Sequence, residues 1–222
     1  MLDDRQRVLI DRPLAELAAR TPLNPNQVSV AGFVIGLAGA ACIVLGAFVP
    51  AAIAIVVNRL ADGLDGAIAR RDGATDFGGY LDIVLDFIFY ASIPFAFALA
   101  DPTNGPWAAF LVFSFVGTSA SFLAFSALAA RRGLTTALRG KKSIYYLGGL
   151  TEGFETICAL LLMCAFPNHF WLIACIFGIM CWITTATRFA AARELLSLSL
   201  IHISEPTRPE RIAYGGVGVK KK

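Results

Sequence analysis

Four aspartates lie in two consecutive apolar stretches of the chain, where charged side chains are costly: Asp62, Asp65, Asp82 and Asp86. An ionisable residue in the middle of a membrane helix costs about 2.5 kcal/mol or more, and is by default a functional candidate. No equal set of basic residues is expected at the same depth to neutralise them. Oxygen ligands without a nearby His or Cys suit Mg²⁺, Mn²⁺ or Ca²⁺ rather than zinc.

Helical spacing allows these carboxylates to meet. Asp62 and Asp65 are three residues apart and share one helix face, while Asp82 and Asp86 are four apart on the next helix. On antiparallel helices joined by a short turn, Asp62, Asp82 and Asp86 lie about 12, 9 and 15 Å deep. We therefore expect four carboxylates to converge in one cavity and to hold two divalent ions, which suits a phosphate-bearing substrate.

Small residues and one arginine accompany the aspartates. Gly66 and Ala69 share the helix face of Asp62. Their small side chains would let a bulky ligand approach the helix backbone. Arg70, at the rim, could hold a diphosphate as a planar fork. The structural alternative is a pair of polar helices that the small residues merely bring close together. This alternative accounts well for Gly66 and Ala69 but poorly for four buried carboxylates.

The composition identifies the medium around these helices. The chain has 222 residues, of which 57% are hydrophobic and 16% charged, against roughly 25% charged in an average soluble domain. Residues 26–57, 87–100, 102–130 and 156–187 contain no Asp, Glu, Lys or Arg. Such runs predict an all-α integral membrane protein. The formal charge of +3 is distributed over short loops, so we expect no nucleic-acid binding.

Six transmembrane helices are expected near residues 26–48, 51–71, 77–100, 106–130, 144–166 and 170–192. The mixed apolar and charged residues 1–22 predict an amphipathic surface helix, with a frayed polar terminus as the alternative. Residues 23–194 form the predicted domain. The tail, 195–222, resembles translated sequencing-adapter sequence or is a disordered extension, and we expect no function there. All basic connections fall on one side, which predicts a bacterial inner or plasma membrane protein with both termini cytoplasmic.

The two acidic segments together resemble the signature of a known family. The first is Asp-x-x-Asp-Gly-x-x-Ala-Arg at residues 62–70, and the second is Gly-x-x-x-Asp-x-x-x-Asp at residues 78–86. All eight defining positions are filled. The chain is thereby similar to the CDP-alcohol phosphotransferases, also called CDP-alcohol phosphatidyltransferases. The resemblance covers about residues 5–193 and implies a six-helix core, a cytoplasmic active site and a homodimer.

The resemblance implies a role for each motif residue. Asp62, Asp65 and Asp82 would bind two divalent ions, Mg²⁺ or Mn²⁺, and Asp86 would be the general base and a possible ligand of the second ion. The residues implied to bind the nucleotide and its diphosphate are Gly66, Ala69, Gly78 and Arg70. Asn26 and Ser29 match the family's Pro-Asn-x-x-Thr start of the first span with Ser in place of Thr. A helix-capping role is the alternative for these two.

The implied reaction is transfer of a phosphatidyl group from CDP-diacylglycerol, or another CDP-alcohol, to a small alcohol in phospholipid biosynthesis, with release of CMP. Two features point to different acceptors. A basic cluster favours a phosphorylated alcohol, or only sets topology and contacts anionic lipid: Arg131, Arg132, Arg139, Lys141 and Lys142. Glu152 and Glu155, beside Tyr145 and Tyr146, favour an amine. Alternatively, these glutamates pair with Arg188 or only line the water-filled cavity.

A membrane cation transporter or channel is the alternative function, because intramembrane aspartates also form ion pathways. It does not account for Arg70 and the spaced glycines. No inverted repeat of the kind found in many transporters is visible in the sequence. We therefore expect a metal-dependent enzyme.

Overall fold

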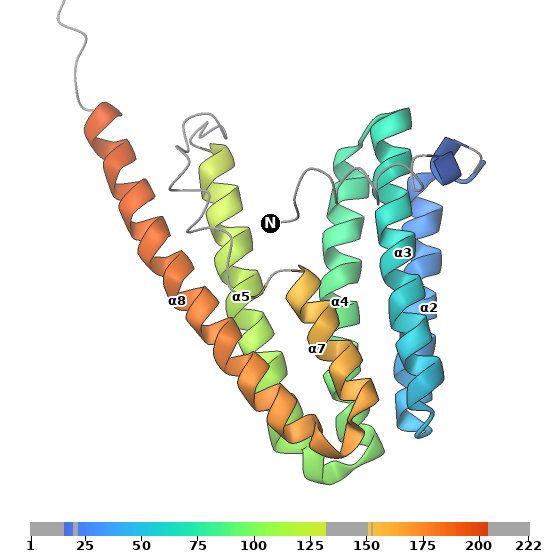
Figure 1. Cartoon of the computed structure of the whole chain (residues 1–222). Coiled ribbons are helices and arrows are strands. Elements are labelled where there is room, and N and C mark those ends of the chain that lie inside the picture. Colours follow the sequence, from blue (N-terminus) through green and yellow to red (C-terminus); the bar gives the residue numbers. More distant parts are fainter. Residues whose placement is uncertain (1–15, 20–21, 132–150, 152, 204–222) are drawn as a thin grey trace, which may run out of the picture.

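A computed structural model describes residues 16–19, 22–131, 151 and 153–203. In these residues the regular structure is helical, without strands, which confirms the all-α class. The elements are α2 (Pro25–Val44), α3 (Phe48–Asp72), α4 (Asp76–Ala100), the 3₁₀ turn η1 (Pro102–Asn104), α5 (Gly105–Arg131), α7 (Gly153–Ala165), the 3₁₀ turn η2 (Pro167–His169) and α8 (Phe170–Ile203). Helices α2, α3 and α4 form one group and α5 and α8 a pair, with α7 between them (Figure 1).

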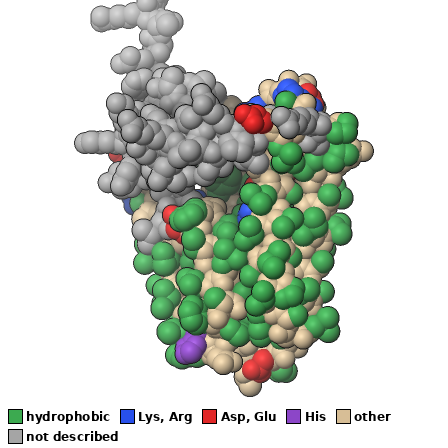
Figure 2. Space-filling model, turned by 45° about the vertical axis from the view of Figure 1, so that its right-hand side comes forward, with side chains coloured by type: hydrophobic (Ala, Val, Ile, Leu, Met, Phe, Trp, Pro, Cys, Tyr) green, Lys and Arg blue, Asp and Glu red, His purple; other side chains and the backbone are tan. Residues whose placement is uncertain are grey.

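Four segments of the described chain are long and apolar enough to cross a membrane: Pro25–Val44, Asp76–Ala100, Pro102–Arg131 and Pro167–Glu194. Helix α3 is as long as α4, but its second half, from Arg59 to Asp72, carries charged residues. Helix α7 is apolar with only 13 residues. Hydrophobic side chains cover most of the face shown in Figure 2, and charged side chains gather toward the two ends. These features are those of an integral membrane protein.

The expected six spans are matched in part. The fifth, at 144–166, falls partly outside the described residues, and most of the predicted surface helix at 1–22 does too. Within 1–22, residues 16–19 are helical. The sixth helix, α8, continues to Ile203 instead of ending near residue 192. No proline interrupts the chain between Pro167 and Pro206, so the predicted tail begins as a continuation of this helix.

The start of α2 is set by local chemistry that the sequence carries. The side chain of Asn24 accepts from the Asn26 N–H at 3.1 Å, and the Gln27 side chain accepts from the Asn24 N–H at 3.1 Å. This is a capping box, followed by Pro25 at the first helical position. Asn24 therefore caps the helix, and the capping role considered for Asn26 and Ser29 is wrong.

Close packing of α2 against its neighbours places the two motif helices. A Cβ atom on Gly32 would lie 2.7 Å from the Cβ of Ala61 in α3, and one on Gly36 would lie 2.6 Å from the ring of Phe89 in α4. Only glycine allows these approaches. Helices α3 and α4 thus pack along α2 rather than closely against each other, which leaves a space between them.

The turn between α3 and α4 makes the two motif helices antiparallel. Gly73, at the end of α3, has φ +102°, a left-handed conformation that favours glycine. Thr75 then caps α4 by accepting from the Gly78 N–H at 3.0 Å. As a result, the end of α3 and the start of α4 lie at the same end of the bundle (Figure 1).

Candidate active site

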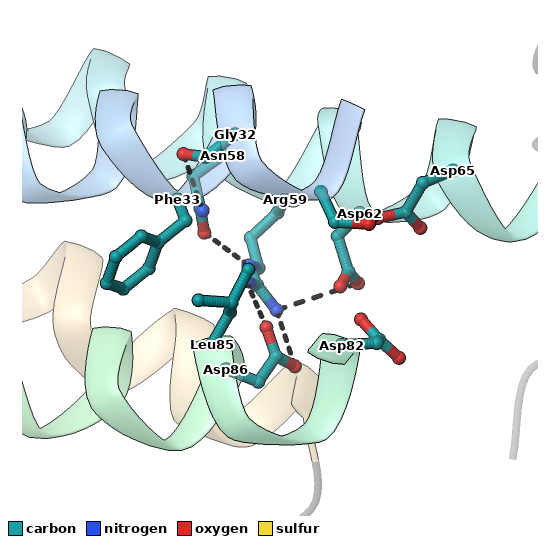
Figure 3. A pocket seen from close by; sticks show the side chains of 10 residues that line it. Gly32, Phe33, Asn58, Arg59, Asp62, Asp65, Asp82, Leu85 and Asp86 are labelled. Atoms are coloured by element: carbon teal, nitrogen blue, oxygen red, sulfur yellow. Dashed lines mark hydrogen bonds and ion pairs between the residues drawn. The ribbon is translucent and has the colours of Figure 1, made fainter. Parts of the chain in front are cut away.

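A pocket lies between α3 and α4, with α2 along its side, and contains the expected acidic residues (Figure 3). The lining comes from all three helices. It consists of Ser29, Gly32, Phe33, Asn58, Arg59, Asp62, Asp65, Asp82, Leu85 and Asp86. The space that α2 keeps open between the motif helices is therefore where the carboxylates meet.

Three of the four expected carboxylates form a compact group. Asp62, Asp82 and Asp86 each offer an oxygen, and these three oxygens lie within 4.8 Å of one another. All three residues are half-buried. Oxygen atoms at this spacing, without His or Cys among them, are donors that Mg²⁺ and Mn²⁺ accept. The residues present therefore fit a divalent ion.

Asp65 lies one turn along α3 and has a different partner. It is only 6% exposed, and its Oδ2 accepts a hydrogen bond of 2.5 Å from the Ser29 hydroxyl of α2. Its carboxylate is not among the three grouped oxygens. Ser29, which the sequence singled out as a nucleotide contact, thus holds Asp65 in the wall of the pocket.

Arg59 is the main residue of this site that sequence reasoning missed. Its guanidinium donates to both oxygens of Asp86, with Nη2–Oδ1 at 2.6 Å and Nη1–Oδ2 at 3.1 Å. Its Nη1 also lies 3.6 Å from Oδ2 of Asp62. A basic residue therefore does lie among the aspartates. The available signal was its position three residues before Asp62, on the same helix face.

The other side of the Arg59 side chain has neutral partners. Its Nε donates to Asn58 Oδ1 at 2.8 Å, and its Nη1 donates to the Tyr90 hydroxyl at 2.9 Å. The guanidinium carbon lies 5.0 Å and 5.2 Å from the ring centroids of Phe89 and Tyr90, within the range of cation–π attraction. Asn58, Phe89 and Tyr90 thus belong to the surroundings of the site.

The two glycines of the motif differ in what lies beside them. A Cβ on Gly66 would meet a single nearby group, the Nη1 of Arg70 at 3.4 Å. Arg70 itself is exposed, and Ala69 is half-buried. A Cβ on Gly78 would lie 3.1 Å from Asn26 Oδ1, so Asn26 and Gly78 lie side by side at the rim.

The residues considered for acceptor binding are described only in part. Arg131 is exposed at the end of α5, and Glu155 is exposed in the first turn of α7. Arg132, Arg139, Lys141, Lys142 and Glu152 lie outside the described residues.

Comparison with known proteins decides the family. The family model described as CDP-alcohol phosphatidyltransferase matches residues 23–190. This chain belongs to that family. It is 50% identical over 167 residues to the inner membrane protein YnjF of Escherichia coli, covering 75% of this chain and 81% of YnjF. The family is one of membrane-bound, metal-binding transferases of phospholipid biosynthesis, so the resemblance drawn from the motif is confirmed.

Two further relatives have names that specify a reaction product. The archaetidylinositol phosphate synthase of Pyrococcus horikoshii is 36% identical over 97 residues, which is 42% of this chain and 52% of that enzyme. The phosphatidylinositol phosphate synthase of Mycolicibacterium smegmatis is 38% identical over 81 residues, 36% of each chain. Each of these two alignments therefore covers less than half of this chain.

Solved structures support the same fold. The phosphatidylinositol phosphate synthase PgsA1 of Mycobacterium tuberculosis, in complex with manganese and citrate, gives a TM-score of 0.58 at 25% identity and covers 82% of this chain and 88% of PgsA1. The same protein with CDP-DAG bound gives a TM-score of 0.52 at 24% identity, with coverage of 93% and 98%. The comparisons give no support to the transporter alternative.

Proposed function

We propose that this protein transfers a phosphatidyl group from CDP-diacylglycerol, or from another CDP-alcohol, to the hydroxyl of a small polar alcohol and releases CMP. The observation that carries the proposal is the group of three carboxylate oxygens within 4.8 Å, which lies in the motif of a transferase family. Such a group suits a metal-assisted phosphoryl transfer better than a purely structural contact between helices.

The metal site of the proposal takes two divalent ions, Mg²⁺ or Mn²⁺, and consists of four aspartates. Asp62, Asp82 and Asp86 supply the grouped oxygens, and Asp65 lies beside them on α3. Manganese in the related PgsA1 structure supports a divalent ion. When bound, the ions supply positive charge that stabilises the negative charge developing on the phosphoryl oxygens. The hydrogen bond from Ser29 holds Asp65 in a fixed orientation for this role.

The proton transfer is assigned to Asp86. Its carboxylate takes the proton from the acceptor hydroxyl as the hydroxyl oxygen attacks the phosphorus that bears the lipid, and CMP leaves. Asp86 is half-buried at the pocket wall, beside the grouped oxygens of Asp62 and Asp82, where an acceptor hydroxyl could reach it.

The donor is held at the rim. Gly66, Ala69 and Gly78 line the path of the CDP group, because their small side chains let it approach the backbone, and Arg70 binds the diphosphate. Asn26, beside Gly78, contacts the nucleotide. The lipid chains of the donor remain in the bilayer. The binding of CDP-DAG by the M. tuberculosis protein of the same fold agrees with this choice.

For the acceptor, we favour a phosphorylated alcohol over an amino alcohol. Two relatives are named synthases of inositol phosphate lipids. A phosphorylated acceptor also matches the basic cluster of residues 131–142. Glu152 and Glu155 would be the contacts of an amine acceptor instead.

The proposal is tested with purified protein in detergent, labelled CDP-diacylglycerol and Mn²⁺. Inositol phosphate, glycerol phosphate, serine, ethanolamine and choline are offered separately, and the lipid products and released CMP are quantified. We expect equimolar CMP and lipid with a phosphorylated acceptor. A product formed only with an amino alcohol would overturn the acceptor choice, and no CMP with any acceptor or other CDP-alcohol would overturn the function.

We also propose that the family domain, residues 23–194, crosses the membrane six times as a homodimer, with both termini and the active site on the cytoplasmic side. The family match at 23–190 supports the domain, and the basic loops support the orientation. Reporter fusions at both termini should report the cytoplasm, and light scattering in detergent should give the mass of two chains. A terminus in the periplasm would contradict the orientation, and the mass of one chain would contradict the homodimer.

A further inference from the structure

We propose that Arg59 is a positioning residue of this site: its guanidinium orients the Asp86 carboxylate and competes with a divalent ion for Asp86 and Asp62. The inference rests on the metal site of the proposed function and adds a group that the family motif does not contain. Its test measures metal binding and stability as well as activity, so that its failure can be told apart from failure of the proposed reaction.

Arg59 reaches some of the grouped carboxylates and not others. Of the three grouped aspartates, it contacts two, with both oxygens of Asp86 as acceptors and one oxygen of Asp62 at 3.6 Å. A two-point contact between guanidinium and carboxylate fixes the plane of the carboxylate as well as its distance. Arg59 therefore determines how Asp86 faces the pocket.

Arg59 also has partners other than the carboxylates. Asn58 is 4% exposed; it accepts from Arg59 Nε at 2.8 Å and donates from Nδ2 to the Gly32 carbonyl at 2.9 Å. The Tyr90 hydroxyl accepts from Arg59 at 2.9 Å, and the Phe89 ring lies beside the guanidinium. These contacts hold the Arg59 guanidinium at the pocket wall, whether or not the carboxylates bind another cation.

Arg59 also changes the charge balance of the aspartate group. Asp62, Asp82 and Asp86 contribute a formal charge of −3 when ionised, and Arg59 reduces the sum for the group to −2. Closely spaced carboxylates stabilise one another's protonated forms unless cations compensate them. Removing the guanidinium therefore leaves the same carboxylates with a greater attraction for any other cation, and Mn²⁺ is the cation with which this can be measured.

Arg59 also connects two helices. Helices α3 and α4 pack mainly on α2, and Arg59 joins α3 directly to α4 through Asp86 and Tyr90. A divalent ion bound by Asp62, Asp82 and Asp86 would join the same two helices, because Asp62 lies on α3 and the other two lie on α4. The ion can therefore replace part of the stabilisation lost with Arg59.

The test compares wild type with R59Q and R59K. Binding of Mn²⁺ is measured by the electron paramagnetic resonance signal of free Mn²⁺, and thermal unfolding is followed with and without Mn²⁺. We expect R59Q to bind Mn²⁺ about tenfold more tightly, equivalent to one lost competing charge contact near 1.4 kcal/mol. It should unfold at a lower temperature without Mn²⁺ and be stabilised by Mn²⁺ more than wild type.

Measurements of kcat and KM test whether Arg59 positions Asp86. R59Q should lower kcat about tenfold or more with little change in the KM for the CDP-alcohol, and R59K should recover part of the loss, because it restores charge without the two-point contact. The control is R71Q on the same helix, since Arg71 pairs with Asp72 outside the pocket. Its Mn²⁺ affinity should equal that of wild type.

Unchanged or weaker Mn²⁺ binding in R59Q would overturn the competition, and an unchanged kcat would overturn the positioning role. If R59Q does not fold, Y90F serves in its place, because it removes one hydrogen-bond partner of Arg59 and keeps the ring. Y90F should shift Mn²⁺ affinity in the same direction by a smaller factor, and no shift would overturn the inference. The Mn²⁺ titration needs no CDP-alcohol, so it tests Arg59 even if no transfer is detected.

Discussion

The two halves of α4 share one helix but differ in what surrounds them. The first half carries Asp82 and Asp86, which are half-buried at the pocket between helices. The second half carries Phe89, Ile93 and Phe97, which are at most 1% exposed and belong to the main hydrophobic core. The change from polar to apolar surroundings takes place at Phe89 and Tyr90, which contact Arg59 on one side and are followed by Ile93 in the core.

One helix thus contributes both to the site and to the hydrophobic core. In the apolar half, Phe97 stacks between Phe48 and Phe170, with ring centroids 5.8 Å and 4.5 Å away. In the polar half, the partners are charged or hydrogen-bonded groups supplied by α2 and α3, such as Arg59. We therefore expect substitutions in the polar half to affect chemistry more than folding, and substitutions in the apolar half to do the reverse.

The largest effect is expected for D86N in the polar half. Asparagine has nearly the same shape but cannot accept the acceptor's proton, so turnover should fall by about 10²–10⁴-fold. Binding of the CDP-lipid should be largely retained, as measured by displacement of a labelled analogue. Near-normal turnover in D86N would contradict the assignment of the base.

The apolar half is tested by F97A. Removing a buried ring that stacks on two others should lower the free energy of unfolding by about 3–5 kcal/mol, measured by thermal or denaturant unfolding in detergent. Turnover at low temperature should remain close to wild type. The matched control is F95A on the same helix, because Phe95 is 60% exposed and its loss leaves no internal cavity. Equal destabilisation by both variants would argue against the packing described here.

A smaller effect is expected for S29A. This variant removes the hydrogen bond to Asp65, and a hydrogen bond to a charged group contributes about 1.5–3 kcal/mol. We expect weaker Mn²⁺ binding by about tenfold or more, measured by titration. S29T keeps the hydroxyl and should behave like wild type. Equal Mn²⁺ affinity in S29A and S29T would mean that the hydrogen bond from Ser29 does not help Asp65 to bind the metal.

The smallest effect is expected at the rim. In G66A the new methyl group would meet only Arg70, so folding should be unaffected, while the narrowed wall should raise the KM for the CDP-donor by about tenfold, or about 1.4 kcal/mol. G79A is the control, because no atom lies within 4 Å of a Cβ there. A similar KM for both variants would remove Gly66 from the donor site.

Much of this arrangement could be predicted because it depends on short-range patterns. Spacings of three and four residues placed Asp62, Asp82 and Asp86 correctly on facing helices, and long apolar runs predicted the membrane helices. The capping box is visible in the sequence as Asn24-x-x-Gln27, a stronger N-cap signal than Asn26 alone. Likewise, the absence of proline before Pro206 already allowed α8 to continue.

The role of Arg59 could not be predicted in the same way. Its position on the face of Asp62 follows from spacing, but its contacts with Asp86 and Tyr90 depend on the distance between α3 and α4. That distance is set by Gly32 and Gly36 on a third helix. A long side chain that crosses between helices is determined by tertiary packing, which the spacing of residues along one helix does not specify.

The most direct test of the central claim is the metal dependence of CMP release from CDP-diacylglycerol by purified wild type and D62N. With a competent acceptor, wild type should release no CMP after chelation and should recover when Mn²⁺ is added. D62N should require a higher Mn²⁺ concentration, because one of its three grouped carboxylates is lost. CMP release that survives chelation, or identical Mn²⁺ titrations for the two proteins, would contradict the assignment of the aspartate pocket as a metal-dependent active site.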